Sequence, residues 1–380
     1  MFRVHGRCHL FGVVVVVGLL ASACSSSAPT ASSSAKGPSY TVQFDVTESG
    51  VSQQFPESPA IVEAAFHGLP VTVDNCDDHG TASGNIDCEH QAVVNHAAVV
   101  IEGTSGADQS VLAAAGIPII GVTNDTSSNS FDLSAAQSLF VGMAVVLHKQ
   151  GCERVGVVID EGGQPEAAEV ANSETWQSVT DAFIPVTAPD LSPYVAKLAQ
   201  AHVQCVITAS LGSQIPQILT AIKQAGLKVP IAIPGVILNS QILGALGNLS
   251  DGLVEIESTP DPSAISPTVT RITKEIHAIN PSAKVTAAAL DAWAWSKIIQ
   301  DAAAKIHGTV DSASMLSALN SLSNAQSDGV YPPISMTPQP NAANRRDFDT
   351  NVLSYVLKNG KATGGGVFVN VGPELNAASG

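Results

Sequence analysis

A regular alternation of short apolar runs with longer helical patterns constrains the fold of this 380-residue chain more than any other feature. The apolar runs are nearly continuous and rich in β-branched residues, which is typical of parallel strands covered on both faces. Several helical patterns end at a glycine, which is a common helix stop. The alternation therefore predicts an α/β fold with parallel sheets. The predicted strands are Thr41–Val46, Val71–Asp74, Ala98–Ile101, Pro118–Val122, Val155–Ile159, Val203–Thr208, Ile231–Ile233 and Leu253–Ile256.

Helical patterns fill the intervals between these strands and dominate the last third of the chain. The expected helices are Pro59–His67, Gln109–Ala115, Ser134–Gln150, Pro193–His202, Gln214–Ala225, Ser240–Leu246, Ser266–Ile279, Val285–Ile306 and Asp311–Leu322. Near the end, Asn359-Gly360 is a favoured two-residue turn, so Asn351–Leu357 and Gly366–Val371 are predicted to form a hairpin.

Two sets of strand–helix units predict two doubly wound parallel-sheet lobes with a ligand cleft between them. We expect residues 40–130 and 259–340 to form lobe 1, and residues 131–258 and 341–380 to form lobe 2. The expected hinge crossings lie near Thr126–Leu133, Thr259–Ser263 and Pro338–Arg345.

The N-terminal segment has the order of a secretory signal. Arg3 and Arg7 precede an apolar run and then the small residues Ala21, Ser22 and Ala23, so residues 1–23 are predicted to be a signal peptide. Cys24 follows directly and resembles the lipid-bearing cysteine of a bacterial lipobox; an ordinary cleaved signal with a nearby cysteine is the alternative. Residues 24–39 are rich in serine and alanine and are expected to form a flexible tether.

The charge balance argues against nucleic acid as a partner. The formal net charge is −16, and only 13% of residues are charged. Phosphate binding needs a basic face, and electrostatic docking to anionic lipid needs basic clusters. Membrane association is therefore expected through the lipid on Cys24 only.

Four cysteines remain for pairing in an oxidising compartment once Cys8 and Cys24 are set aside. Cys76 and Cys88 lie twelve residues apart across what is expected to be a polar, glycine-containing loop, and they are the expected first pair. Cys152 and Cys205 either bridge neighbouring strands or remain buried thiols. Zinc is not expected, because the chain has no Cys-x-x-Cys pair.

Polar turns follow several predicted strands, and ligands of open parallel sheets bind at this edge. In the first set, Thr104 and Ser105 lie in a Gly-Thr-Ser-Gly turn, and Thr123 and Asn124 follow the next strand. Such turns offer backbone N–H groups and hydroxyls to a small acceptor, although ordinary caps and Asx turns have the same composition. Asp160, Ser210 and Gly235 occupy the equivalent positions in the second set.

Enzyme motifs are weak. The Gly103-x-Ser105-Gly106 turn differs from the nucleophile elbow, because its second glycine comes one residue early. A Ser–His–Asp triad stays open, since sequence spacing does not constrain one. His79, His90 and His96 are interpreted as residues of a solvated loop in preference to metal ligands. We expect no catalytic residue, no metal and no cofactor.

Several segments together resemble the type I periplasmic-binding-protein family, and more narrowly the branched-chain amino-acid-type substrate-binding lipoproteins of ABC importers. The resemblance spans roughly Tyr40 to Val371. It is carried by Val73-Asp74-Asn75-Cys76-Asp77-Asp78, Val99–Ser105, Gly116-Ile117-Pro118-Ile119-Ile120, Gln224-Ala225-Gly226-Leu227 with Pro230, and Asp291-Ala292-Trp293. Asp160-Glu161-Gly162-Gly163 stands where the family commonly has Tyr-Gly.

The resemblance implies a solute receptor that closes on its ligand and delivers it to an ABC-transporter permease. It implies Ser105 and Thr123 as the main ligand contacts, with Thr104 and Asn124 beside them. The expected solute is a small polar molecule, an amino acid or a related carboxylate or amide. A surface sensor or adaptor that binds a partner protein, and less favourably a hydrolase, are the alternatives.

Overall fold

The computed structural model describes residues 39–50, 54–104, 109–123, 127–133, 136–185, 187–210, 214–238, 240–264, 266–338 and 346–378. Gly37–Gly380 forms one compact unit. The predicted signal peptide, the lipobox Cys24 and nearly all of the tether lie outside the described residues, as do Ser105 and Asn124.

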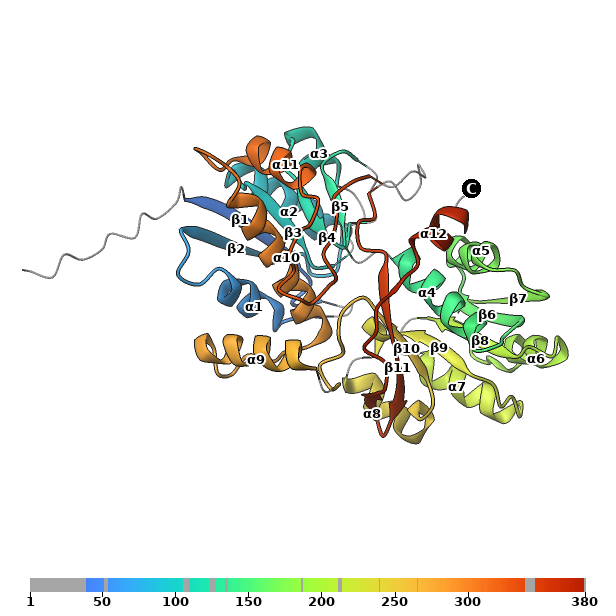
Figure 1. The fold of residues 1–380 in the computed structure, drawn as a ribbon. Helices are drawn as coiled ribbons and strands as arrows, with labels where there is room; N and C mark the ends of the chain where they lie inside the picture. The colour runs from blue at the N-terminus through green and yellow to red at the C-terminus, as the bar shows by residue number, and fades with distance from the viewer. Residues whose placement is uncertain are drawn as a thin grey trace, which may run out of the picture. The chain divides into compact units, whose positions relative to one another are not determined.

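The first sheet is parallel and has the strand order β2-β1-β3-β4-β5 (Figure 1). Its strands are β1 (Tyr40–Val46), β2 (Val71–Asp77), β3 (Val99–Glu102), β4 (Ile119–Gly121) and β5 (Ser130–Asp132). The helices that alternate with them are α1 (Ser58–Ala65), α2 (Ala82–Val94) and α3 (Ser110–Ala115).

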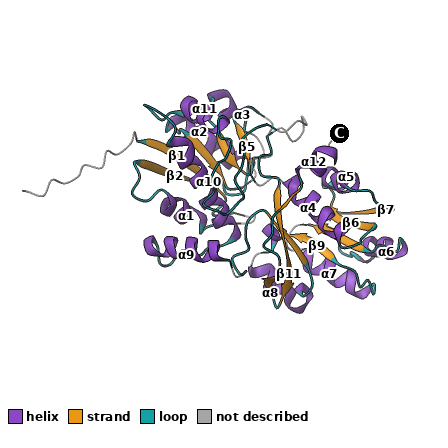
Figure 2. Cartoon of the chain, in the orientation of Figure 1, coloured by secondary structure: helices purple, strands orange, loops and turns teal. Residues whose placement is uncertain are grey.

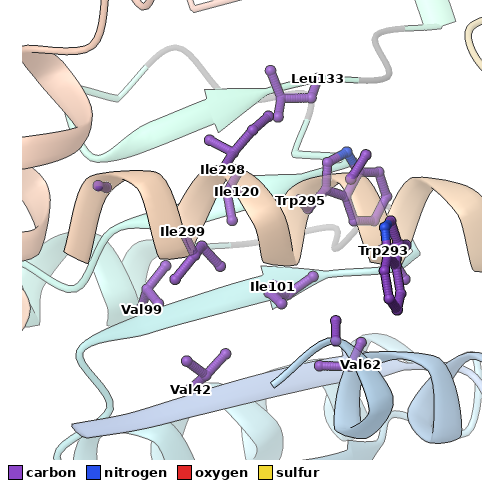
Figure 3. Close-up of a cluster of buried hydrophobic side chains, with 14 of the residues drawn as sticks. Val42, Val62, Val99, Ile101, Ile120, Leu133, Trp293, Trp295, Ile298 and Ile299 are labelled. Carbon is purple, nitrogen blue, oxygen red and sulfur yellow. The ribbon is translucent and has the colours of Figure 1, made fainter. Parts of the chain in front are cut away.

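Helices from the last third of the chain complete the core of this sheet. They are α9 (Pro267–Ile279), α10 (Ala287–Ala303) and α11 (Ser312–Asn320). Figure 3 shows side chains of α10, including Trp293 and Ile299, among those of β1, β3 and β4. On the opposite face, Val100 and Ile119 pack against α2 and α3. The sheet is therefore covered on both faces, which explains its continuous apolar strands.

The second sheet has the order β12-β11-β10-β9-β8-β6-β7. Its central strands are parallel, whereas β11 and β12 are antiparallel additions at one edge. The strands are β6 (Arg154–Asp160), β7 (Ser178–Ile184), β8 (Cys205–Ala209), β9 (Ile231–Pro234), β10 (Val254–Glu257), β11 (Asn351–Lys358) and β12 (Lys361–Thr363), and β13 (Val369–Asn370) also pairs with β11.

Helices flank the second sheet on both faces (Figure 2). One face packs on α4 (Ala136–Lys149), α5 (Gln164–Ser173) and α12 (Gly372–Ala378). The other packs on α6 (Ser192–Gln200), α7 (Ile215–Gln224) and α8 (Ser240–Leu246). Short 3-10 turns cover Gly235–Ile237 and Gly247–Ser250. The predicted α/β class with parallel-sheet lobes is confirmed.

Several elements differ from the sequence prediction. Strand β5 occupies part of the span that was expected to be a hinge. It was not predicted, because three residues are too few to give a recognisable strand pattern. The segments α2, α5, β7 and α12 were not predicted; α2 has many polar residues, which weakens its apolar period. The Asn359-Gly360 turn does join a hairpin, but its second strand is Lys361–Thr363, while Val369–Asn370 pairs with the opposite end of β11.

Both expected disulfides are present. Cys76 in β2 bonds to Cys88, which lies in helix α2 and not in a loop. Cys152, just before β6, bonds to Cys205 at the start of the neighbouring strand β8. The second pair settles the choice between a bridge and buried thiols in favour of a bridge.

The chain passes between the two sheets after β5, after β10 and before β11. Residues near the last passage contact the first sheet. The ring of Phe348 stacks on that of Phe131 in β5, and the backbone of Asp347 forms an isolated parallel β-bridge with Asp132. The Arg346 guanidinium lies against both rings, 4.4 Å from Phe131 and 4.7 Å from Phe348. Most of the expected hinge Pro338–Arg345 lies outside the described residues.

No helix among the described residues is long and apolar enough to cross a membrane.

Candidate functional site

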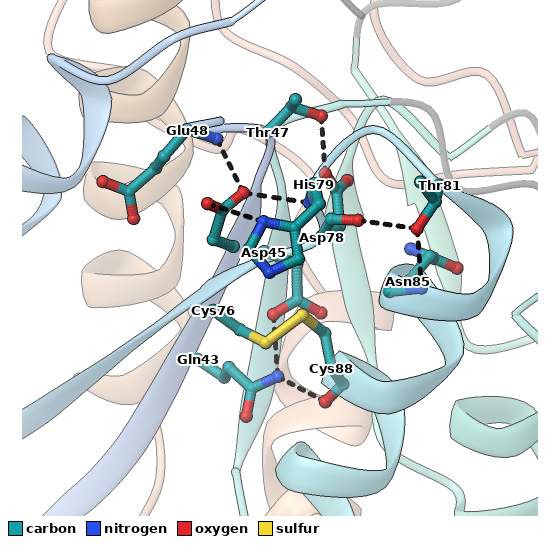
Figure 4. Close-up of a disulfide and its surroundings, with 12 residues drawn as sticks. Gln43, Asp45, Thr47, Glu48, Cys76, Asp78, His79, Thr81, Asn85 and Cys88 are labelled. Atoms are coloured by element: carbon teal, nitrogen blue, oxygen red, sulfur yellow. Dashed lines mark hydrogen bonds and ion pairs between the residues drawn. A yellow bond between two sulfur atoms is a disulfide. The ribbon is translucent and has the colours of Figure 1, made fainter. Parts of the chain in front are cut away.

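The carboxyl edge of the first sheet carries a hydroxyl–carboxylate network (Figure 4). Thr47 follows β1, Asp78 follows β2 and Thr104 follows β3. The Thr47 hydroxyl donates to Oδ1 of Asp78 at 2.6 Å, and the Thr104 hydroxyl donates to Oδ2 at 2.9 Å. Of the predicted residues here, Thr104 therefore lies at the strand edge, with its proton directed to Asp78 and its oxygen able to accept.

Two buried acids lie behind this network. Asp45 and Glu102 are paired in the register of β1 and β3, so their side chains are neighbours on the face that packs on α2. Gln43 donates to Asp45 Oδ1 at 2.7 Å and to the carbonyl oxygen of Cys88 at 2.7 Å. Burial raises the pKa of Asp45 to about 7, and burial together with Asp45 raises the pKa of Glu102 well above its usual value. Both acids therefore keep their protons to a higher pH than exposed carboxyl groups do.

Thr123 has a different environment from Thr104. Its side chain is only 1% exposed, and its hydroxyl shares a 2.5 Å hydrogen bond with Ser130. Gln109 donates to its carbonyl oxygen at 3.0 Å. In this conformation Thr123 ties the end of β4 to β5, and its role as a ligand contact stays a prediction.

The carboxyl edge of the second sheet brings together three predicted residues from separate strands. Asp160 ends β6, Ser210 directly follows β8, and Gly235 directly follows β9. These strands are parallel neighbours, so the three positions share one edge. The Ser210 side chain is 6% exposed, and its hydroxyl has no hydrogen-bond partner among the described residues. It is therefore a buried donor and acceptor without a partner at the strand edge.

Gly235 leaves room for an acid that the sequence did not single out. Glu257 ends β10, beside β9 in the parallel register. A β-carbon at Gly235 would lie 2.0 Å from Oε1 of Glu257, so any other residue there would displace this carboxyl group. Glu257 is 4% exposed. The structure thus adds Glu257 to the edge formed by Asp160, Ser210 and Gly235.

Glu257 belongs to a set of acids that we call the acidic group: Glu255, Glu257, Asp291 and Asp349. Burial raises the pKa of Glu255 to about 8 and that of Glu257 well above its usual value. Burial also raises the pKa of Asp291 and of Asp349 to about 7. The signal that sequence analysis missed is two glutamates at alternate positions in the apolar run Val254–Glu257, where both share one side of a buried strand.

A serine, a histidine and an aspartate do meet at the end of β2, without forming a catalytic relay. The Ser49 hydroxyl donates to Oδ2 of Asp77 at 2.6 Å and lies 2.8 Å from Nδ1 of His79. Asp77 Oδ2 lies 3.1 Å from the same Nδ1. A relay requires the serine and the aspartate to bond opposite ring nitrogens. Here the serine hydroxyl is directed to the carboxylate, so the histidine is not placed to activate it.

The described residues contain one group with metal-ligand spacing, Asp45 with Cys76 and Cys88. Both sulfurs of this group form the disulfide and are not thiolates. The group therefore lacks the deprotonated sulfur ligands that a soft metal requires.

Comparison with solved structures shows the same fold. A leucine-binding protein LivK from Thermotoga maritima has a TM-score of 0.71 at 13% identity, covering 87% of this chain and 99% of that one. An ABC transporter substrate-binding protein from Sphaerobacter thermophilus has a TM-score of 0.71 at 16% identity, covering 89% and 99%. A fatty acid ABC transporter substrate-binding protein from Thermomonospora curvata has a TM-score of 0.67 at 14% identity, covering 88% and 92%.

A search of curated proteins gave no match. A family model described as "Periplasmic binding protein" matches residues 60–353, which is more than three quarters of the chain. That span contains both sheets except β1, most of β11 and the strands after β11. The chain therefore belongs to the periplasmic binding protein family and has its type I fold.

Proposed function

We propose that the protein is an extracytoplasmic, lipid-anchored solute receptor of an ABC importer. It captures a small polar solute, an amino acid or a related carboxylate or amide, and presents it to the permease. Members of this family bind small solutes outside the cytoplasm, and ABC-transporter substrate-binding proteins deliver them to permeases.

The observation that carries this proposal is the pair of strand edges. Thr104 lies at the carboxyl edge of the first sheet. Asp160, Ser210 and Gly235 lie at the carboxyl edge of the second. In α/β sheets this edge is where ligands bind. Ser105, next to Thr104 in the sequence, and Asn124, next to Thr123, complete the proposed set of ligand contacts.

The two sheets with their helices are the proposed lobes, with boundaries at 40–130 and 259–340 for lobe 1 and at 131–258 and 341–380 for lobe 2. Strand β5 extends the first sheet to Asp132. A solute that touches both edges binds the closed form more tightly than the open form, so it shifts the population toward closure. The passages of the chain after β5, after β10 and before β11 are the proposed hinges.

The experiment that tests the function is native mass spectrometry on freshly purified protein, followed by thermal unfolding against a metabolite panel. A retained small molecule, or a rise in melting temperature with a solute, is the expected result. An unchanged melting temperature across the panel, with one specific partner protein recovered, overturns the proposal in favour of an adaptor. Ester or amide turnover that is lost in a Ser49→Ala variant overturns it in favour of a hydrolase.

The lipid anchor on Cys24 has its own test. The wild-type protein is expected in the membrane fraction, with the mass of a diacylated N-terminal cysteine after removal of residues 1–23. A Cys24→Ser variant is expected in the soluble extracytoplasmic fraction. Equal release of both forms contradicts the anchor while leaving solute binding unaffected.

A further inference from the structure

The carboxyl ends of the parallel strands, together with the residues that follow them, contain acidic residues but no lysine or arginine. Twelve acids occur in these segments, among them Asp78 in the first sheet and Asp160 and Glu257 in the second. The segments are residues 47–50, 77–80, 102–108, 121–127, 132–135, 160–164, 185–190, 209–213, 234–239 and 257–262. Because ligands of this fold bind at these ends, the charge of the segments sets the charge of the ligand that is preferred.

The acidic group concentrates this charge beside the edge of the second sheet. Glu255, Asp291 and Asp261 all raise the pKa of Glu257 by electrostatic repulsion, in addition to the effect of burial, so these groups lie within range of one another. Asp349 acts in the same direction on Asp291. Among the described residues, no lysine or arginine lowers the pKa of any of these four acids. Within that part of the chain, the acids therefore have no basic side chain as a counter-charge.

Buried oxygens in this group also lack hydrogen-bond donors. Asp349 is 2% exposed; its Oδ1 accepts from the backbone N–H of Asn351 at 3.0 Å and from its side-chain amide at 2.9 Å, while Oδ2 has no partner among the described residues. Glu255 is 3% exposed, and its Oε2 is also without a partner there. Buried acceptors without donors are costly. Each oxygen, once its carboxyl group is ionised, is an acceptor for a ligand N–H group.

Because Gly235 has no side chain, Glu257 of the acidic group has room for its carboxyl group at the strand edge. The Glu257 carboxyl group fills the space beside the Gly235 backbone, where a β-carbon would be 2.0 Å from Oε1. It therefore reaches the edge that also carries Ser210 and Asp160. Of the two glutamates of β10, Glu257 is therefore the one nearer this edge, and Glu255 lies two residues farther along the same side of the strand.

We infer that the solute is a net cation, an amine or guanidinium compound, and that Glu257 at the edge of the second sheet contacts its charged nitrogen. This inference rests on the proposed receptor function, and it replaces the carboxylate and amide solutes proposed there by cationic ones. A protonated nitrogen supplies both the missing charge and the missing donors. The acids at both strand edges repel an anionic carboxylate. A zwitterion is also less favoured than a net cation, because its negative group is repelled while its positive group is attracted.

Binding of a cation is coupled to proton release. The negative charges of Glu255, Asp291 and Asp261 oppose ionisation of Glu257, and that of Asp349 opposes ionisation of Asp291. The Tyr331 hydroxyl donates to Oδ1 of Asp291 and favours the ionised form of that acid, while burial and, to a smaller extent, Glu257 raise the pKa of the neighbouring Tyr355. The pKa values of the acids are raised, to about 8 for Glu255 and to about 7 for Asp291 and Asp349, so protons must leave before the carboxylates pair with a cation. Affinity for a cationic solute therefore increases from pH 5.5 to pH 8.

The test is titration calorimetry with the full-length protein at pH 5.5 and pH 8. The cationic probes are putrescine, spermidine, agmatine, arginine and lysine, and the comparison probes are leucine, glutamate and octanoate. At least one cationic probe is expected to bind, about tenfold or more tightly at pH 8, and to release protons in buffers of different ionisation enthalpy. Glu257→Gln and Asp349→Asn are each expected to lower its affinity about tenfold or more.

Glu275→Gln is the matched control, because it removes one charge from an exposed position in α9 and is expected to leave affinity unchanged. The circular dichroism of each variant shows whether it is folded, and the two acidic-group variants serve as alternatives if one is not. Tight binding of an uncharged, zwitterionic or anionic probe that Glu257→Gln does not weaken overturns the inference and leaves the receptor function intact. Failure of every probe to bind, with no retained small molecule in native mass spectrometry, overturns the receptor function itself.

Discussion

The carboxyl group of Glu257 occupies the space that a side chain at Gly235 would need, because a β-carbon there would lie 2.0 Å from Oε1 and 2.6 Å from Cγ. Two adjacent parallel strands thus meet at their carboxyl ends with an acid on one and no side chain on the other. Glycine is needed here for space and not for a positive φ angle, since Gly235 is not among the glycines with left-handed backbone. The pair determines which polar group the second sheet presents at its edge.

Gly235→Ala is expected to lower the free energy of unfolding by about 1–3 kcal/mol, the usual cost of overpacking a buried site. The same substitution in a Glu257→Ala background is expected to cost much less, since the clashing carboxyl group is absent. Urea unfolding of the wild type, both single variants and the double variant measures this coupling. Additive effects of the two substitutions would contradict the proposed contact.

Two variants compare a hydroxyl expected to contact the solute with a hydroxyl expected to stabilise the fold: Ser210→Ala removes the first, and Thr123→Val removes the second. The Ser210 hydroxyl has no partner among the described residues, so its removal is expected to leave the melting temperature nearly unchanged and to weaken solute binding by roughly 2- to 10-fold. The Thr123 hydroxyl bonds Ser130, which is fully buried, so Thr123→Val is expected to lower the free energy of unfolding by about 1–3 kcal/mol. Thermal unfolding and calorimetry on both variants provide the comparison; a loss of stability in Ser210→Ala would argue against a site role.

The free energy of unfolding is expected to decrease toward alkaline pH, because the buried acids of the first sheet must then ionise. Burial raises the pKa of Asp45 from 3.8 to about 7, so its stabilising contribution is fully present below about pH 4 and is lost as the pH rises through about 7. The loss is on the order of a few kcal/mol. Asp45→Asn keeps an acceptor for Gln43 and cannot ionise, so it is expected to be more stable than the wild type at pH 8 and to show a shallower pH profile.

Urea unfolding at several pH values between 4 and 8 measures this profile, and Asp87→Asn, at an exposed position in the same α2 region, is the control. A wild-type profile that rises toward pH 8, or an Asp45→Asn profile that matches the wild type, would show that Asp45 is not buried in the protonated form.

The two disulfides are expected to contribute unequally. Cys76–Cys88 closes a short loop with a sequence separation of 12, and Cys152–Cys205 spans a separation of 53. In the chain-entropy model the first is worth about 3 kcal/mol and the second about 4 kcal/mol. Replacing each pair by alanine and measuring urea unfolding tests this order. A larger loss for the Cys76–Cys88 pair would show that packing beside Gln43 and Asp45, more than loop closure, sets the contribution of that bond.

Local signals account for what the sequence predicted correctly. Apolar β-branched runs are recognisable within five residues, and the glycines that end α3 and α7 mark helix ends that need no tertiary context. The short strand β5 and the polar helix α2 were missed for the opposite reason. They are stabilised by contacts outside their own segments: β5 pairs with β4 and stacks on Phe348, which is distant in sequence, and α2 is bonded to β2 through the disulfide.

The candidate site shows the same division. Asp160, Ser210 and Gly235 were predicted because each directly follows an apolar strand, and the structure places them at one edge. Glu257 was missed because its importance depends on an absent side chain across the strand pair and on acids from α10 and the segment before β11. Sequence spacing carries no record of such neighbours.

The sequence by itself determined the α/β class, the parallel strands and the cysteines that remain to pair, because each depends on the apolar or chemical character of a short stretch of chain. Only the tertiary structure decided which acids are buried together and which oxygens lack donors. Those properties arise when strands and helices from distant parts of the chain exclude water from the same space, and the free energy of a charge depends on that environment more than on the residue itself.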